Sequence, residues 1–350
     1  MSTALTNVRV FDGQRLTEPT TVVIDGTNIV DNAGGAREMD AGGATLLPGL
    51  IDCHLHLTGP QTLDTLASWG VTTALDMGFW PAELVRSTRE HTGGADFRSA
   101  GLAAIGPDGI HVKILKLPAE SIVRTPDDAR RHVEARVADG VDYIKGIAEA
   151  PGDGGPSQET LTALVDAAHE HGLKAIMHAA SVGAYTVAVA TGADYITHVP
   201  TDGVINAEDI ARMRANGQIN ISTTVGLESM GGPEDDLLAN VAALHEAGVE
   251  ILTGTDAHPA MPGVPDDLPY GESLHREFEL LARAGVPPVE ILRSATELPA
   301  RAFGLTDRGR VEPGLRADLL LVDGDPTVDI TATRKIRAVW CAGRLITGQR

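Results

Sequence analysis

The sequence has little cysteine, few aromatic residues and little positive charge, and each shortage excludes a class of protein. Its two cysteines, Cys53 and Cys341, form no spaced cluster, which argues against a disulfide framework or a cysteine-rich metal site. Lys and Arg total 28 against 48 Asp and Glu, so the formal charge of -20 would repel nucleic acid and anionic membranes. Because only 3% of the residues are aromatic, Val, Leu, Ile and Ala must fill the core, which suits buried parallel strands.

Long apolar runs are missing as well. No stretch approaches the roughly 20 apolar residues that cross a bilayer, and residues 1–7 lack the basic start and apolar run of a signal peptide. We therefore expect a cytoplasmic protein that acts on a small molecule and binds neither membrane nor nucleic acid.

Both ends of the chain have the pattern of β-strands. Short alternating segments are separated by turn signals such as Asp12-Gly13 and Asp25-Gly26. These segments are 8–11 and 21–24 near the start, and 318–322 and 336–340 near the end. We expect residues 1–47 and 311–350 to complete one small β-sandwich together.

Residues 48–310 change to short apolar runs that alternate with helical stretches, which is typical of repeated βα units. Helical periodicity is clear in 158–171 and 236–247. The expected strands are 47–54, 72–77, 98–105, 141–147, 173–178, 194–198, 218–224 and 250–255. Eight such units predict an α/β fold, a (β/α)₈ TIM barrel, whose active-site loops follow the C-terminal ends of the strands. The Gly-rich and Pro-rich segment 148–157 follows the fourth strand and is expected to be a wall of the pocket.

Potential metal ligands stand at the ends of several of these strands. His54 and His56 are two residues apart in a strand, so both imidazoles point to one face. His178, His198 and Asp256 each close another expected strand. Because parallel strand ends share one edge, these five side chains are expected to surround one barrel mouth and to bind metal there.

Lys145 ends the fourth strand, where an unpaired cation beside a metal ion would be repelled. If CO₂ adds to its neutral amine, the product is a carbamate anion whose two oxygens could bridge two metals about 3.5 Å apart. The alternative is a lysine that extends to solvent or pairs with a carboxylate.

In order and in local sequence, these residues resemble the amidohydrolase superfamily, in particular its prolidase-like and imidazolonepropionase-like branch. The segments that carry the resemblance span most of the chain. They are Pro48–His56, Gly70–Thr73, Tyr143–Lys145, Ile196–His198, Gly254–Ala257, Gly309–Gly314 and Ala317–Leu319.

The resemblance implies a binuclear metal centre that hydrolyses a C–N bond, as well as a homo-oligomer. It implies that His54, His56 and Asp256 hold one metal, and that His178 and His198 hold the second. Carboxylated Lys145 and a hydroxide would bridge the two ions, and Asp256 would move the proton from the attacking hydroxide to the leaving nitrogen. Imidazole and carboxylate ligands favour Zn²⁺, with Mn²⁺, Fe²⁺, Co²⁺ and Ni²⁺ as alternatives.

The segments after His56 and around the third strand are short compared with the family pattern, so the family's substrate contacts are not carried over. Position alone suggests residues that follow strand ends: Trp80, His111, Thr201, Asp202, Glu228, Met230 and His258. His275 and Glu277 fall on an expected helix and favour packing roles. Cys53 alternates with the ligands and is expected to be a buried apolar residue.

Three other functions stay open. The same two metals would polarise an ester, lactone or phosphotriester as well as a dipeptide, an N-acyl amino acid or a cyclic amide. A ring deaminase would use one metal, but such relatives generally lack the bridging lysine, so Lys145 favours the two-metal hydrolase. A non-catalytic scaffold is disfavoured because all six site residues are present.

Overall fold

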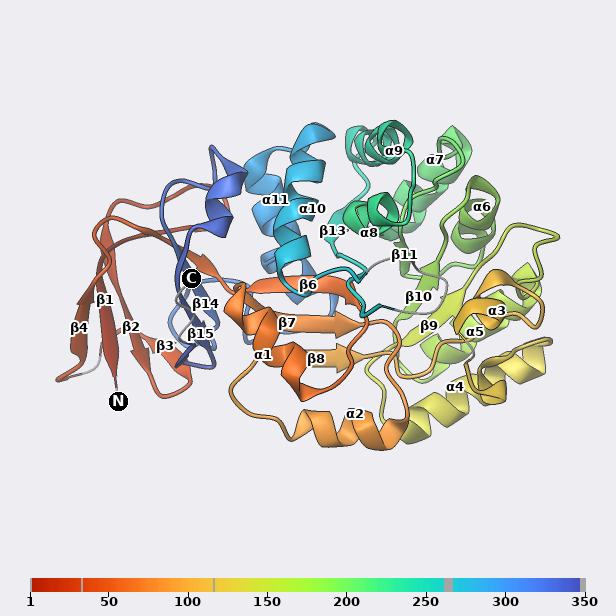
Figure 1. Cartoon of the computed structure of the whole chain (residues 1–350), viewed down its shortest axis with the longest axis horizontal. Helices are drawn as coiled ribbons and strands as arrows, with labels where there is room; N and C mark the ends of the chain where they lie inside the picture. Colours follow the sequence, from red (N-terminus) through yellow and green to blue (C-terminus); the bar gives the residue numbers. More distant parts are fainter. Residues whose placement is uncertain (1, 33, 116, 261–266, 347–350) are drawn as a thin grey trace.

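The computed structural model describes residues 2–32, 34–115, 117–260 and 267–346. Figure 1 shows a small sheet at one end of the molecule and a larger body of parallel strands surrounded by helices. No helix among these residues is long and apolar enough to cross a membrane.

The small sheet is built from both ends of the chain. Its eight strands follow the order β16-β15-β14-β5-β1-β2-β3, with β4 also paired to β1. The bounds are β1 Thr3–Val10, β2 Thr20–Asp25, β3 Asn28–Val30, β4 Arg37–Asp40, β5 Thr45–Pro48, β14 Leu319–Val322, β15 Ile336–Cys341 and β16 Arg344–Ile346. The N-terminal half of β1 pairs with β2 and β4, while its C-terminal half pairs with β5. One buried cluster, which includes Leu5, Leu46, Leu319 and Trp340, is shared by the strands from both ends.

The larger body contains eight parallel strands in two sheets, β6-β7-β8 and β13-β12-β11-β10-β9. Their bounds are β6 Leu50–Leu55, β7 Val71–Asp76, β8 Asp96–Ser99, β9 Ile144–Ile147, β10 Ala175–His178, β11 Tyr195–Thr197, β12 Ile219–Ser222 and β13 Ile251–Thr253. Parallel bridges join the two sheets on both sides, between Leu55 and Ala257 and between Ala104 and Gly146. The strand ends of both sheets therefore lie at a common edge.

Helices follow the strands and cover their outer faces (Figure 1). They are α1 Pro60–Ser68, α2 Ala82–Arg89, α3 Ile110–Leu115, α4 Pro126–Asp139, α5 Gln158–Glu170, α6 Val182–Ala190, α7 Ala207–Asn216, α8 Thr224–Ser229, α9 Glu234–Glu246, α10 Glu272–Arg283, α11 Pro288–Ser294 and α12 Glu297–Ala302, with 3₁₀ turns Ala119–Ser121 and Ile330–Arg334. Gly140 ends α4 with a φ of 79°, a left-handed conformation that glycine adopts without strain.

Two expected strands differ from the structure. The first divides at Gly49 into β5 and β6, because β5 pairs with β1 and β14 of the small sheet while β6 pairs with β7. Thr72 packs closely at this point, since a Cβ on Gly49 would lie 2.2 Å from its Oγ1. The third was expected over 98–105, but β8 ends at Ser99. The apolar residues beyond it are buried by other contacts, since Ile105 bridges to Ile122.

Apolar side chains from both parallel sheets pack into one interior cluster. Its members include Ile51 and Cys53 of β6, Leu75 of β7, Ile176 of β10 and Leu252 of β13. Cys53 is thus a buried apolar residue, as its place in the sequence predicted. The cluster fills the space between the strands and leaves their C-terminal ends for polar side chains.

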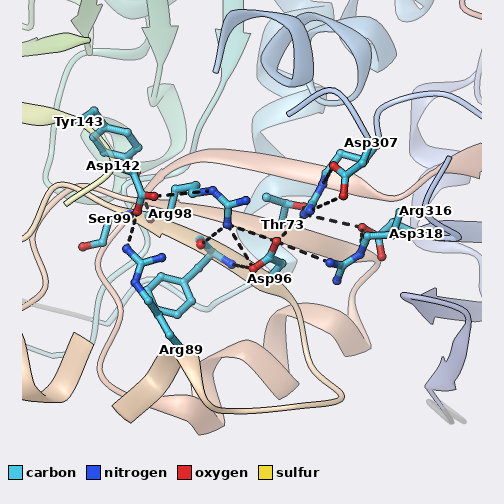
Figure 2. Close-up of polar contacts among 12 residues, drawn as sticks. Thr73, Arg89, Asp96, Arg98, Ser99, Asp142, Tyr143, Asp307, Arg316 and Asp318 are labelled. Atoms are coloured by element: carbon cyan, nitrogen blue, oxygen red, sulfur yellow. Dashed lines mark hydrogen bonds and ion pairs between the residues drawn. The ribbon is translucent and has the colours of Figure 1, made fainter. Parts of the chain in front are cut away.

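A network of ion pairs connects the parallel strands to the chain that returns to the small sheet. Figure 2 shows the side chains of Asp96 in β8, Thr73 in β7 and the segment 307–318 meeting there. Arg308, whose side chain is 4% exposed, lies 2.8 Å from Asp96 and 3.8 Å from the buried Asp318. It also donates to Thr73 Oγ1 at 3.0 Å. The network fixes the body against the small sheet, at the end away from the polar strand ends.

Candidate metal centre

Three possible ligands from β6 and β13 meet at the shared strand edge. His54 lies in β6 and His56 one residue past it, while Asp256 follows β13. The Nε2 atoms of His54 and His56 are 3.2 Å and 3.1 Å from Asp256 Oδ1. One ligand atom from each residue lies within 4.8 Å of the other two, which is close enough for a shared metal ion.

Two more histidines extend this cluster. His178 ends β10, and His198 follows β11. Their ring centroids are 4.3 Å apart, and the ring of His198 is 4.7 Å from that of His54. All five side chains expected to be ligands therefore lie in one contiguous group.

Lys145 in β9 is buried within this group. Its Nζ donates to Thr197 Oγ1 at 2.9 Å and forms no ion pair with a described residue. Burial lowers the pKa of Lys145 to about 7, although the carboxylates of Asp256 and Asp76 oppose this shift. The amine is thus neither exposed nor paired with a carboxylate, which were the two alternatives for its position.

The backbone is left-handed at two of these residues. His198 has a φ of 74° and Asp256 a φ of 62°, a conformation that costs a non-glycine residue about 1–3 kcal/mol. The amide of Asp256 donates to His54 O at 2.7 Å. His198 O accepts from Asn220 Nδ2 at 2.8 Å, and His198 Nδ1 is 2.6 Å from Thr223 Oγ1. These bonds keep both side chains turned toward the cluster.

The protonation states of three histidines and of Asp256 suit metal ligands, whereas at His56 burial is outweighed by the hydrogen bond to Asp256 and by its charge, which raise the pKa of that imidazole. Burial, followed by the charge of Lys145, lowers the pKa of His54 to about 3. Burial also lowers the pKa of His178 and of His198 well below the ordinary value. Burial would raise the pKa of Asp256, but the neighbouring His54 and His56 outweigh it and lower that pKa. Neutral imidazoles and an ionised carboxylate are the forms that bind metal.

Buried polar residues that sequence reasoning did not select support the ligands. Asp52 accepts from the amide of His54 at 3.2 Å and from Thr255 Oγ1 at 2.7 Å. Asp76 accepts from the amide of Leu57 at 3.0 Å and from Ser99 Oγ at 2.6 Å. Both aspartates interrupt apolar strands, a signal in the sequence that could have identified them.

A cavity of about 470 Å³ opens at the cluster. Trp80, His111, Met230 and His258 line it, as their positions after strand ends suggested. Whether these four contact a substrate stays a prediction.

Three other suggested contacts are not among the residues that line this cavity. Thr201 donates through its Oγ1 to Ala180 O at 3.1 Å, so its hydroxyl is used within the fold. Asp202 is exposed and accepts from the amide of Val182 at the start of α6. Whether either residue contacts a substrate stays a prediction.

Glu228 is likewise outside the cavity, because it pairs with Arg276 of α10 at 2.8 Å. Buried His275 contacts Trp69 O at 3.0 Å and Thr333 Oγ1 at 2.9 Å. Glu277 accepts from the amides of Thr224 and Val225. His275 and Glu277 thus make contacts within the fold, and whether Glu228 contacts a substrate stays a prediction.

The segment 148–157 lies beside the cluster. Glu149 Oε1 is 3.0 Å from His111 Nδ1, and the amide of Asp108 donates to Gly154 O at 3.1 Å. The loop after β9 thus packs against the start of α3, which carries His111, and against the residues just before it.

Comparison with known proteins gives the family. A sequence model of the amidohydrolase family matches residues 45–346. The chain belongs to the amidohydrolase family. The family that the sequence motifs resemble is therefore confirmed.

Individual relatives of this amidohydrolase are distant. It is 25% identical over 331 residues to an enamidase of Eubacterium barkeri, covering 86% of this chain and 78% of the enamidase. It is 29% identical over 194 residues to an imidazolonepropionase of Deinococcus deserti, covering 53% of this chain but only 45% of that enzyme. A solved Xaa-Pro dipeptidase with bound methionine has the same fold, with a TM-score of 0.84, 23% identity and 99% of both chains covered.

Proposed function

We propose that this amidohydrolase uses two divalent metal ions to hydrolyse a C–N bond in a small amide-like substrate. The observation that carries the proposal is the convergence of four histidines and Asp256 around a buried lysine at one strand edge. We further infer that the eight parallel strands form one closed (β/α)₈ barrel over residues 48–310, supported by the bridges on both sides. Residues 1–47 and 311–350 would form the small domain.

The chemistry of the donor set fits metal ions. His54, His56 and Asp256 offer two imidazole nitrogens and a carboxylate oxygen in mutual reach, and they would hold one ion. His178 and His198 would hold the second. Neutral imidazoles with a carboxylate suit Zn²⁺ first, and Mn²⁺, Fe²⁺, Co²⁺ or Ni²⁺ accept the same donors.

Lys145 would complete the centre as a carbamate. Its amine nitrogen would form a bond to CO₂ and release a proton, and the resulting anion would hold both ions. The burial of Lys145 without an ion-paired partner supports this, because a carbamate removes the positive charge that would repel the metals.

The remaining residues would position the reaction. The metals supply a water of lowered pKa and polarise the scissile carbonyl. Asp256, whose carboxylate is ionised and lies between His54 and His56, would take a proton from that water and deliver it to the leaving nitrogen. The left-handed backbone of Asp256 and His198 keeps both side chains directed at the reacting atoms.

The named relatives favour C–N chemistry, since one is named for imidazolonepropionate and another for an enamide. An ester, lactone or phosphotriester hydrolase would use the same metals, and a ring deaminase would use one. We therefore propose amide hydrolysis as the function and keep the others as outcomes of its test.

The test compares the protein before and after removal of metal by a chelator. Hydrolysis of amides should disappear with the metal and return with added Zn²⁺. His178→Asn should lose metal and activity, whereas His245→Asn, at a histidine of α9 that pairs with Glu290, should keep both. Ester or lactone cleavage without amide cleavage, release of ammonia from aminated heterocycles with one metal bound, or absence of metal from the wild type would contradict the proposal.

A further inference from the structure

Beyond the proposed metal ligands, the cavity is apolar. Its wall includes Leu57, Phe79, Leu84, Ile105, Leu117 and Ile147. Trp80, Ile110 and Met230 are exposed at its rim, at 38%, 56% and 44%. Outside the proposed ligands, the polar side chains among the described lining residues are Thr58, His111 and His258. These lining residues include no arginine, and Lys145 is their one lysine.

His111 does not offer a free positive charge. Its Nδ1 is 3.0 Å from Oε1 of Glu149, a carboxylate whose side chain is 8% exposed. The second carboxylate oxygen of Glu149 is buried without a hydrogen-bond partner. Gly109 leaves room for this carboxylate, because a Cβ there would lie 2.2 Å from it. Any positive charge on His111 is therefore compensated by Glu149, which would also repel an anion bound beside it.

His258 contacts the backbone through one of its ring nitrogens. Its Nδ1 is 2.8 Å from Pro259 O, and a carbonyl oxygen can only accept, so Nδ1 carries the proton. Its Nε2 is buried and has no hydrogen-bond partner.

We propose that the cavity takes an uncharged amide or carbamate bearing an apolar group, such as a phenyl ring or a branched alkyl chain, and rejects substrates that carry a free carboxylate on that group. The proposal rests on the proposed function for the place of the scissile bond. Burying the apolar group against these walls is favourable, whereas a carboxylate there would lose its water and, among the described lining residues, meet no arginine and no lysine other than Lys145. The net charge of -20 adds long-range repulsion of anions. Dipeptides and N-acyl amino acids are thus disfavoured.

A pair of ligands that differ by one carboxylate tests this directly. N-(2-phenylethyl)acetamide and N-acetylphenylalanine share the acyl and phenyl groups. Binding of each is measured by calorimetry on chelator-treated protein, where no metal can attract the acid. Hydrolysis is measured on the Zn²⁺-loaded protein. We expect the neutral amide to be favoured by about tenfold or more in Kd and in kcat/KM. Equal binding, preference for the acid, or binding of neither overturns the proposal.

Two arginine variants localise the effect. Met230→Arg places a cation at the cavity rim and should bring the affinity for the acid close to that for the amide. Val204→Arg places the same cation at a site that is 52% exposed and outside the lining, and it should leave the preference unchanged. The same shift in both variants would overturn the proposal.

Failure of this inference is distinguishable from failure of the proposed function. If the neutral amide binds preferentially but the Zn²⁺-loaded protein hydrolyses no C–N bond, the inferred substrate class is supported and the proposed function is contradicted. If amides are hydrolysed but N-acetylphenylalanine is preferred, the proposed function is supported and the inferred substrate class is contradicted.

Discussion

Asn220 is the residue whose replacement best separates the geometry of the metal centre from the stability of the fold. It is fully buried in β12, and its Nδ2 donates to His198 O at 2.8 Å and to Ile196 O at 3.2 Å. Asn220→Leu keeps a similar volume but removes the donor. An unsatisfied buried carbonyl costs about 1–3 kcal/mol. Because Ile196 lies in the parallel ladder with β12, the main loss is at His198 O, and the free energy of unfolding should fall by about 1–3 kcal/mol.

The effect should reach the metal as well. His198 has a φ of 74°, and the bond from Asn220 helps to hold that conformation. Without it the backbone can relax and move the imidazole, and loss of such supporting contacts typically weakens metal binding by about 10–100-fold. Urea unfolding of the metal-free protein gives the stability, and competition with a chelator gives the Zn²⁺ affinity.

Gln218 provides a matched control two residues away. It is also buried, and its Nε2 donates to two backbone carbonyls, Val189 O at 3.3 Å and Ala193 O at 2.9 Å, away from the metal centre. Gln218→Leu should therefore lower stability by a similar amount while Zn²⁺ affinity is unchanged. Equal losses of Zn²⁺ affinity in both variants, or no loss in Asn220→Leu, would show that Asn220 does not support metal binding through His198.

Three more predictions concern charge. Arg308→Met removes the buried cation 2.8 Å from Asp96, while Asp318 keeps Arg316 at 2.9 Å, and it should cost about 1.5–3 kcal/mol in urea unfolding. Exposed Arg310→Met should change stability by less than about 0.5 kcal/mol. Burial would raise the pKa of Asp96, but Arg308 and other arginines outweigh it and lower that pKa below 3.8. The stability from this carboxylate is therefore present above pH 3.8 and lost as pH falls through the lowered pKa, and Asp96→Asn should flatten that acid limb of a pH series. Asp256→Asn should abolish amide hydrolysis and reduce the rise in Tm with added Zn²⁺; an unchanged Zn²⁺-induced rise would contradict its place as a ligand.

The C-terminal ends of the strands could be predicted from the sequence, because a simple local pattern marks each of them. A short apolar run that closes on His178, His198 or Asp256 predicts both the strand and the edge to which the side chain belongs. Because the strands are parallel, their C-terminal ends meet at one edge. His56 Nε2 therefore lies 3.1 Å from Oδ1 of Asp256, which is 200 residues later in the chain. The fold class and the candidate cluster therefore followed from local patterns together with one topological rule.

What could not be predicted depends on contacts between distant segments. The apolar run after Ser99 reads as strand, yet Ile105 is buried against Ile122 and the sheet ends earlier. Glu228 follows a strand as a pocket residue would, but Arg276, 48 residues later, pairs with it. An interrupted apolar strand marks a polar support such as Asn220, but the sequence does not show which groups it contacts, since His198 and Ile196 belong to the neighbouring strand segment.

Metal content per chain, measured in the wild type and in Lys145→Ala, both purified without chelators, separates a bridged two-metal centre from a single-metal one. We expect about two ions per wild-type chain, with one or both lost and amide hydrolysis abolished in the variant. One ion held equally by both proteins would contradict the bridged centre.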